Sequence, residues 1–431
     1  MNLDRLNDWI LPPTTSKQAR TLLIGRALRA FCDGYVSVLL PAYLLALGLG
    51  AWEVGLIGTA TLLGSALATL AVGTWGHRLP HRRLLSGAAL LMAATGIAFA
   101  GFSSFWPLLL AAFVGTLNPS AGDVSLFLPL EHARLAEAAD GDARTTLFAR
   151  YSLVGSLFAA AGFLAVALPE WLTIAGLEHS TALRGMFLLY GGVGLLVWWL
   201  YRKIPDPTPH QAALPKPLGA SRGVVVRLAV LFSVDAFAGG MIVHSLLALW
   251  LFQRFDLSLA AASYFFFWAG LATACSLLAA PWVTRRIGLL NTMVFMHLPS
   301  NILLILAALV PNLELSLGLL ILRGLLSQMD VPTRSAFVMA VVTPPERVAA
   351  ASFTSVPRSL AAAIGPLLGG ALFAAGWLAT PLVACGLLKI VYDLALLFSF
   401  RRYRGIPVQP PPKKLLKKKK RSGEFFPQGF D

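Results

Sequence analysis

Charged side chains interrupt stretches of this sequence that are otherwise apolar. Asp330 and Arg334 fall between "LSLGLLILRGLL" and "VMAVV", and Asp33 lies within "RAFCDGYVSVLLP". Burying an ionised group in an apolar interior is costly unless the group is paired, hydrogen-bonded or used by a ligand. A desolvated carboxylate can also take up a proton, because its neutral form is favoured there. Ion pairing, proton transfer and ligand binding are therefore the chemistries that these residues could support.

The composition identifies the solvent around these charges. Of the 431 residues, 57% are hydrophobic and only 13% are charged, whereas a soluble domain carries about 25% charged residues. Apolar stretches of about 20 residues, the length that crosses a bilayer core of about 30 Å, recur along the whole chain. The expected fold class is an all-α polytopic membrane protein. We predict twelve transmembrane helices, at 21–48, 53–75, 84–104, 106–130, 147–169, 182–201, 225–253, 259–283, 289–311, 313–341, 349–376 and 380–400.

The net charge of +15 is distributed unevenly over the connections between these spans. With the N-terminus inside, the cations gather in the cytoplasmic connections, at 77–83, 202–223, 284–288 and 344–347. This bias sets the orientation of multi-pass proteins, and it predicts a protein of the cell inner membrane with both termini in the cytoplasm. The same placement argues against nucleic acid as a partner. The lysine-rich tail predicts contacts with anionic lipids.

The second half of the chain repeats features of the first half. "HRLP" (77–80) has a counterpart in "RRIG" (285–288), and Arg150 has one in Arg358, each 208 residues later. Repetition of this kind predicts two pseudo-symmetric six-helix bundles. The expected divisions are a cytoplasmic segment at 1–20, the two bundles at 21–201 and 225–400, a linker between them at 202–224, and a basic tail at 401–431.

The arrangement of spans and loops resembles the major facilitator superfamily. The signature of that family after its second span is Gly-x-x-x-Asp-Arg-x-Gly-Arg-Arg, and this chain has Gly73, Arg78 and Arg82 in register. It departs from the signature with a histidine at the acid position and a proline at the second glycine. The copy in the second half keeps Arg286. The resemblance implies a cavity between the halves and transport by rocking of one half against the other.

Polar residues near the middle of several spans are candidates for the transport site. Asp33 and Asp235 lie in spans one and seven, which the resemblance places at the cavity, so each could carry a coupling proton or contact substrate. The alternative for Asp33 is an ion pair with Arg26 or Arg29, which precede it by one or two helical turns. The candidates for proton coupling or for lining the cavity are Asp33, Asp235, Asp123 and Asn118.

Aspartate and arginine also recur at equivalent places in the two halves. Because the pattern is duplicated, we expect Asp–Arg ion pairs between adjacent spans, joining Asp123 to Arg150 and Asp330 to Arg358, as structural ties or gates. Asp330 could instead pair with Arg334, four residues further on the same helix. Direct handling of substrate or protons is the alternative role. This gate or structural group comprises Asp330, Arg334, Arg358, Arg150, Arg78, Arg82 and Arg286.

The last spans contain further polar residues at helical spacing. Lys389 and Asp393 lie four apart in span twelve, which predicts that they pair with each other. His297 and Asn301 share one face of span nine, so we expect them to bond within the second half.

No pattern for enzymatic chemistry accompanies these charges. The seven histidines are dispersed, and the sequence contains neither His-Glu-x-x-His nor Gly-x-Ser-x-Gly nor a phosphate-binding glycine loop. We therefore expect a monomeric secondary transporter without metal or cofactor. "GPLLGG" (365–370) resembles a signature of drug-exporting members of the superfamily, so we predict proton-coupled export of a small organic compound. Uptake or exchange of a sugar, organic acid or other metabolite is the alternative, and the buried charges are compatible with either sign of substrate.

Overall fold

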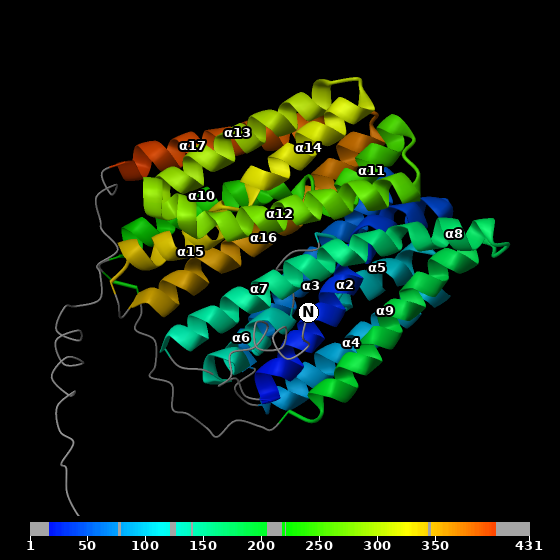
Figure 1. The fold of residues 1–431 in the computed structure, drawn as a ribbon, viewed down its shortest axis with the longest axis horizontal. Coiled ribbons are helices and arrows are strands. Elements are labelled where there is room, and N and C mark those ends of the chain that lie inside the picture. The colour runs from blue at the N-terminus through cyan, green and yellow to red at the C-terminus, as the bar shows by residue number, and fades with distance from the viewer. Residues whose placement is uncertain are drawn as a thin grey trace, which may run out of the picture.

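The computed structural model describes residues 17–75, 79–120, 126–138, 141–204, 218–219, 221–343 and 346–401, and no strand occurs among them (Figure 1). The N-terminal segment to residue 16, linker residues 205–217 and the tail from residue 402 lie outside this set, as do Arg78 and Asp123. The first half comprises α2 (Lys17–Ala46), α3 (Ala51–Trp75), α4 (His81–Gly101), α5 (Phe105–Val114), α6 (Phe127–Ala138), α7 (Gly141–Leu164), η2 (Ala165–Ala167), α8 (Leu168–Ile174) and α9 (His179–Tyr201). The second comprises α10 (Arg222–Gly240), α11 (His244–Phe255), α12 (Leu259–Ile287), α13 (Leu289–Leu309), α14 (Leu313–Ser327), α15 (Asp330–Val341), α16 (Arg347–Ala374) and α17 (Thr380–Phe400).

These helices confirm the prediction of a twelve-span membrane protein. Eleven described segments are long and apolar enough to cross a bilayer, and α5 is a shorter apolar helix at the place of the fourth span. Several neighbouring described helices are joined by short connections. Gly288, for example, is the single residue between α12 and α13, and its φ of 85° lies in a region that a side chain rarely allows. The arrangement is consistent with two bundles of six spans.

Three spans that we expected to be continuous are interrupted. The fourth is divided into α5 and α6, the seventh into α10 and α11, and the tenth into α14 and α15. Proline contributes to the first interruption, because Pro119 has no N–H to continue a helix. The backbone groups that this break releases are bonded elsewhere: the Pro119 carbonyl accepts from the Ser245 N–H at 3.0 Å, and the Thr116 carbonyl accepts from the Tyr190 hydroxyl at 2.9 Å. Broken helices commonly line substrate sites in transporters.

The buried apolar residues fall into three clusters that describe how the halves meet. We call the end where α2 begins and α17 ends the terminal end, and the opposite end the far end. One cluster draws residues from both halves towards the far end, including Leu44, Ile57 and Trp250. Towards the terminal end each half has a cluster of its own, one between residues 19 and 204 and one between 225 and 400. In Figure 1 the two halves accordingly meet near α8 and α11 and diverge in the opposite direction.

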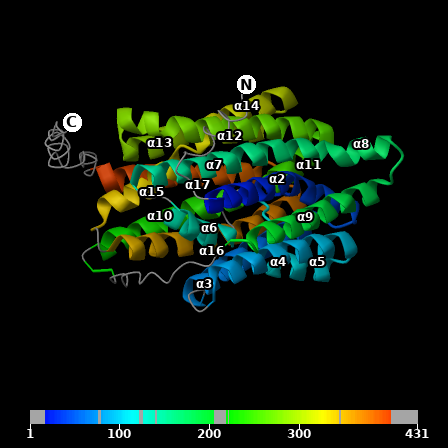
Figure 2. The same cartoon turned by 60° about the horizontal axis from the view of Figure 1, so that its bottom comes forward.

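Helices α3 and α16, one from each half, make the closest contact across the interface (Figure 2). A Cβ atom on Gly55 would lie 2.6 Å from the Pro366 carbonyl oxygen and 2.8 Å from the Gly370 Cα atom. A Cβ atom on Gly370 would lie 2.7 Å from the Gly55 Cα atom. Real side chains do not tolerate such distances to backbone, so this approach requires glycine at both positions. The "GPLLGG" motif therefore joins the two halves at the far end.

We predict that replacing Gly55 with valine weakens this contact. Overpacking a close interface costs about 1–3 kcal/mol, so Gly55→Val should lower the free energy of unfolding in mixed micelles by about that amount relative to its control. The control is Gly73→Val in the same helix, since a Cβ atom at Gly73 has nothing within 4 Å. Equal losses of stability in the two variants would show that the α3–α16 contact is not sterically limiting.

Candidate functional site

The interruptions of the fourth and seventh spans meet at the interface between the halves. The Ser245 N–H of α11 donates to the Pro119 carbonyl, and the neighbouring His244 ring lies beside the backbone of Ser120. The oxygen of the Asn118 side chain accepts from the Ser120 N–H at 3.2 Å and from its hydroxyl at 2.8 Å. Asn118 is buried, and these two hydrogen bonds stabilise the backbone where the fourth span is interrupted.

Aromatic rings from both halves stack beside this junction. The Phe163 ring, on α7, lies 5.6 Å from the His244 ring with an angle of 25° between the planes. Phe266, on α12, lies 5.5 Å from Phe163 and 5.9 Å from His244. We call these three rings the ring cluster.

A buried network of charges connects four helices of the second half. The Asp235 carboxylate of α10 accepts from the Lys389 ammonium of α17 at 2.5 Å, and it lies 3.6 Å from the Arg334 guanidinium of α15. The His297 ring of α13 is within 4.0 Å of the same carboxylate. Each of these four helices contributes at least one charged or titratable group, so the network ties the bundle together where an isolated charge would be costly.

The partners within this network differ from two of our predictions. Lys389 was expected to pair with Asp393 of its own helix α17, but its ammonium group instead pairs with Asp235 of α10. Asp393 instead lies 2.9 Å from the His297 Nδ1 atom and accepts from the Asn301 amide at 3.2 Å. The expected bonding of His297 and Asn301 inside the second half is thereby explained, since both contact one carboxylate.

The expected ion pair between Asp330 and Arg358 is not formed. Asp330 accepts a hydrogen bond from Arg334, its neighbour four residues along α15, which was the alternative that helical spacing allowed. Arg334 reaches both Asp330 and Asp235, and this leaves no acid of the network for Arg358. For the matching pair of the first half, Asp123 with Arg150, the aspartate lies outside the described residues. No described residue forms an ion pair with Arg150.

The first half contains a buried acid that the sequence analysis missed. Glu131 of α6 is fully buried and accepts hydrogen bonds from Arg29 of α2, Tyr151 of α7 and Tyr201 of α9. We had ended the fourth span at residue 130, because the following "EHARLAEA" is too polar for a hydropathy window. The signal that was available is amphipathic: Phe127, Leu130 and Leu135 recur on one helical face beside Glu131.

Asp33 lies close to this network but does not belong to it. Its side chain is only 7% exposed, yet among the described residues it has no hydrogen bond and no ion pair. The expected pair with Arg29 is absent because Glu131 holds that guanidinium, and the guanidinium of Arg26 lies 5.2 Å from the ring centre of Tyr151. Asp33 interacts with both arginines only through the longer-range electrostatic field.

The gate or structural group also includes three arginines of the basic turns. Arg78 lies outside the described residues, and Arg82 is an exposed residue of α4. Arg286 is exposed at the end of α12, where its guanidinium lies 5.2 Å from the ring centre of Trp282. Their assignment as gate residues stays a prediction.

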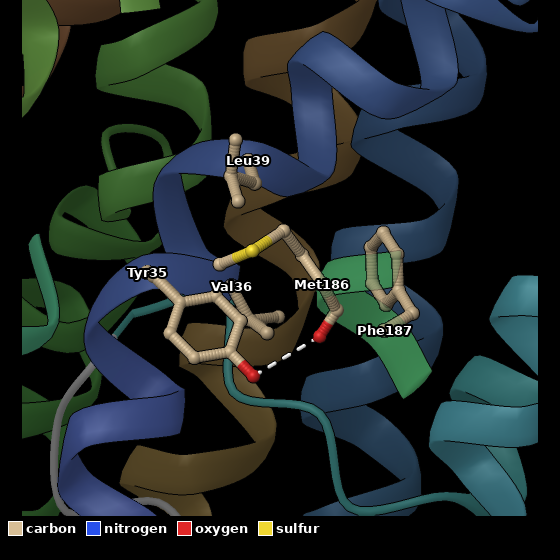
Figure 3. Close-up of a pocket in the computed structure, with 5 residues that line it drawn as sticks. All are labelled: Tyr35, Val36, Leu39, Met186 and Phe187. Atoms are coloured by element: carbon tan, nitrogen blue, oxygen red, sulfur yellow. Dashed lines mark hydrogen bonds between the residues drawn. The ribbon is translucent and has the colours of Figure 1, made fainter. Parts of the chain in front are cut away.

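A small space between α2 and α9 is not the transport site. Tyr35, Val36 and Leu39 of α2 face Met186 and Phe187 of α9 around a volume of about 120 Å³ (Figure 3). The Tyr35 hydroxyl closes one side by donating to the Met186 carbonyl at 3.1 Å. Because pockets for organic ligands have volumes of about 300–1,000 Å³, this space is a packing gap within the first half.

Comparison with known proteins identifies the family. The model of the Major Facilitator Superfamily matches residues 22–320. The chain belongs to this superfamily. It is 23% identical over 422 residues to the uncharacterized membrane protein YJR124C of Saccharomyces cerevisiae, covering 89% of this chain and 94% of that protein. It is also 27% identical to a D-xylose transporter of Levilactobacillus brevis over 131 residues, which are 30% of this chain and 28% of the transporter.

Solved structures of superfamily transporters share the fold. A bacterial homolog of the human lysosomal transporter Spinster, in an inward-facing and occupied conformation, has a TM-score of 0.69 at 16% identity, with 89% of this chain and 96% of that chain covered. The nucleoside transporter NupG has a TM-score of 0.68 at 16% identity, with 90% and 100% covered. Family and structural neighbours are thus transporters rather than enzymes, as the sequence analysis expected.

We predict that Glu131 contributes strongly to the stability of this superfamily member. Glu131→Gln removes the charge that compensates buried Arg29, and breaking a buried ion pair on one side costs about 3–5 kcal/mol. The measurement is the free energy of unfolding in mixed micelles. Glu53→Gln is the control, since Glu53 accepts only the Gly50 N–H near the surface. A loss in Glu131→Gln no larger than in the control would contradict a paired, charged Glu131.

Proposed function

We propose that this chain is a proton-coupled secondary transporter that moves a small organic compound by alternating access. The observation that carries the proposal is the state of Asp33. It is a buried carboxylate near the middle of α2, and it has no direct partner among the described residues. It interacts electrostatically with Arg29 and Arg26 at longer range. A carboxylate in that setting is able to switch between a charged and a neutral form, because neither form is fixed by a close ion pair.

The packing of the halves supports a route for the compound. Contacts at the far end close one side of the interface, while separate apolar clusters leave the halves independent at the terminal end. If the terminal end faces the cytoplasm of the cell inner membrane, as the basic connections suggest, the arrangement is inward-open. Protonation of Asp33 would then change its attraction to Arg26 and Arg29 and favour one arrangement of the halves over the other.

We propose export as the direction of transport, on the resemblance of "GPLLGG" to the signature of drug exporters. The second candidate is uptake or exchange of a sugar or another metabolite, which the similarity to the Levilactobacillus brevis D-xylose transporter favours. Contact of the basic tail with anionic lipids belongs to the same proposal, because it would keep that tail on the inner leaflet.

The experiment that tests this function compares the natural chain with Asp33→Asn. A bacterial host without its main efflux pumps, expressing either form, is exposed to a panel of drugs and metabolite analogues. We expect the natural chain to raise the inhibitory concentration of at least one compound, and Asp33→Asn to lose that effect because it cannot exchange a proton. Everted vesicles carrying a pH-sensitive dye then report whether the compound discharges the proton gradient.

The matched control for this experiment is Asp256→Asn, because Asp256 is the left-handed cap at the end of α11 and lies between two spans. Equal protein levels of all three forms in the membrane must be shown by immunoblot. Resistance that survives in Asp33→Asn would contradict the role of Asp33. Increased sensitivity to an analogue in cells with the natural chain would assign uptake instead of export.

A further inference from the structure

Arg323 is a charged residue of the second half that plays no part in the proposed proton coupling. It lies on α14, between the exposed Leu322 and the buried Gly324. Its Nε atom is buried without a hydrogen-bond partner, and among the described residues no acid forms an ion pair with it. A guanidinium within a transmembrane helix is costly to keep without a counterion, and a bound ligand could supply that counterion.

The Arg323 side chain faces the interior of the bundle. Leu315, Leu322 and Leu325 occupy the exposed side of α14, whereas Gly324 packs against α12, 3.3 Å from the Ala269 carbonyl oxygen. Arg323 interacts electrostatically with His244 of α11 and with Cys385 of α17. Ala269 follows Phe266 by three residues on α12, so the part of α14 that contains Arg323 and Gly324 packs next to the ring cluster.

The acids of the second half that could neutralise Arg323 are already engaged. Asp235 is held by Lys389 and Arg334, and Asp330 is held by Arg334. Asp393 is held by the His297 ring and by the Asn301 amide. No described carboxylate of this bundle interior is left over, so the region between the charge network and the ring cluster carries excess positive charge.

From these observations we infer that Arg323 and the ring cluster form the binding site for the transported compound, and that this compound is an organic anion with a flat apolar ring. A carboxylate or sulfonate can accept two parallel hydrogen bonds from one guanidinium. Phe163 and Phe266 are 3% and 1% exposed in this arrangement, so its ring would stack against them, in an offset or edge-on geometry, once the halves separate at this point. The inference rests on the proposed function and deepens it, because it selects the charge of the substrate that the sequence left undecided.

The site also connects binding with the movement of the halves. Phe163 belongs to the first half, whereas Arg323, His244 and Phe266 belong to the second. A ring inserted beside Phe163 would contact both halves at once, next to the bond between Pro119 and Ser245. A bound anion would thereby favour one packing of the two halves, which is what a transported compound must do.

The test measures equilibrium binding by the full-length chain in detergent, without any proton gradient. The probes share one ring system and differ in charge: 2-naphthoate, 2-naphthamide and 2-naphthylmethylamine, with acetate as an anion that lacks the ring. Thermal stabilisation as a function of concentration gives an apparent Kd for each probe. We expect 2-naphthoate to stabilise the protein, and the amide, the amine and acetate to do so at least about tenfold less effectively.

Variants then assign the binding to Arg323. Arg323→Gln should raise the apparent Kd for 2-naphthoate by at least about tenfold, the loss expected for a charged hydrogen bond, whereas Arg323→Lys should recover part of the affinity. Phe266→Leu should raise the apparent Kd for 2-naphthoate, measured relative to the variant's own melting temperature without ligand, because Phe266 is a buried core residue whose truncation also lowers that temperature. Arg254→Gln is the control, because Arg254 donates to the Val310 carbonyl at 3.3 Å near the far end.

Several results would overturn the inference. They are equal binding of the amine and the naphthoate, tight binding of acetate, binding that persists in Arg323→Gln, or no stabilisation by the naphthoate. A failure of proton coupling is distinguishable from each of these. If 2-naphthoate binds in an Arg323-dependent manner while Asp33→Asn transports normally, the anion site stands and the proposed role of Asp33 falls.

Discussion

The contact between α3 and α16 is the constraint on which the rest of the architecture depends. Only glycine at positions 55 and 370 lets these two backbones approach so closely at the far end. Because the halves share one apolar cluster there and have separate clusters at the terminal end, the interface can open at one end without exposing the core of either half. Each bundle can consequently move as a unit.

Charge pairing links the helices within each bundle. Glu131 joins three helices of the first half through Arg29, Tyr151 and Tyr201, and Asp235 joins α10 to α15 and α17 in the second. These ties satisfy most of the ionised groups that the bilayer would otherwise penalise. Among the charged groups that form no ion pair with a described residue, Asp33 lies in the first half and Arg323 in the second. Under our proposals the first exchanges a proton and the second binds an anion.

Hydropathy, charge placement and internal repetition were sufficient to predict the class, the number of spans and the superfamily. These patterns did not predict polar residues that are buried because neighbouring side chains compensate their charge. Glu131 was left outside the membrane because a hydropathy window registers its charge but not Arg29, Tyr151 and Tyr201 around it. Arg358 was assigned to Asp330 because duplication shows that a residue type recurs, whereas helix rotation determines which neighbour it reaches. The interruption at 328–329 carries a tertiary contact that the sequence pattern does not reveal, from the Gln328 N–H to the Ser276 hydroxyl.

The most direct test of the account is a pair of spin-label distances, measured in nanodiscs at high and low pH. One pair, at Trp75 and Phe353, reports the terminal ends of α3 and α16, and the other, at Trp52 and Trp377, reports their far ends; all four side chains are exposed, and Cys275, whose thiol is also exposed, is replaced by serine. The account predicts that pH changes the two distances in opposite directions, and that Asp33→Asn abolishes the change. Distances that stay constant, or that change together, would contradict rocking of two rigid halves.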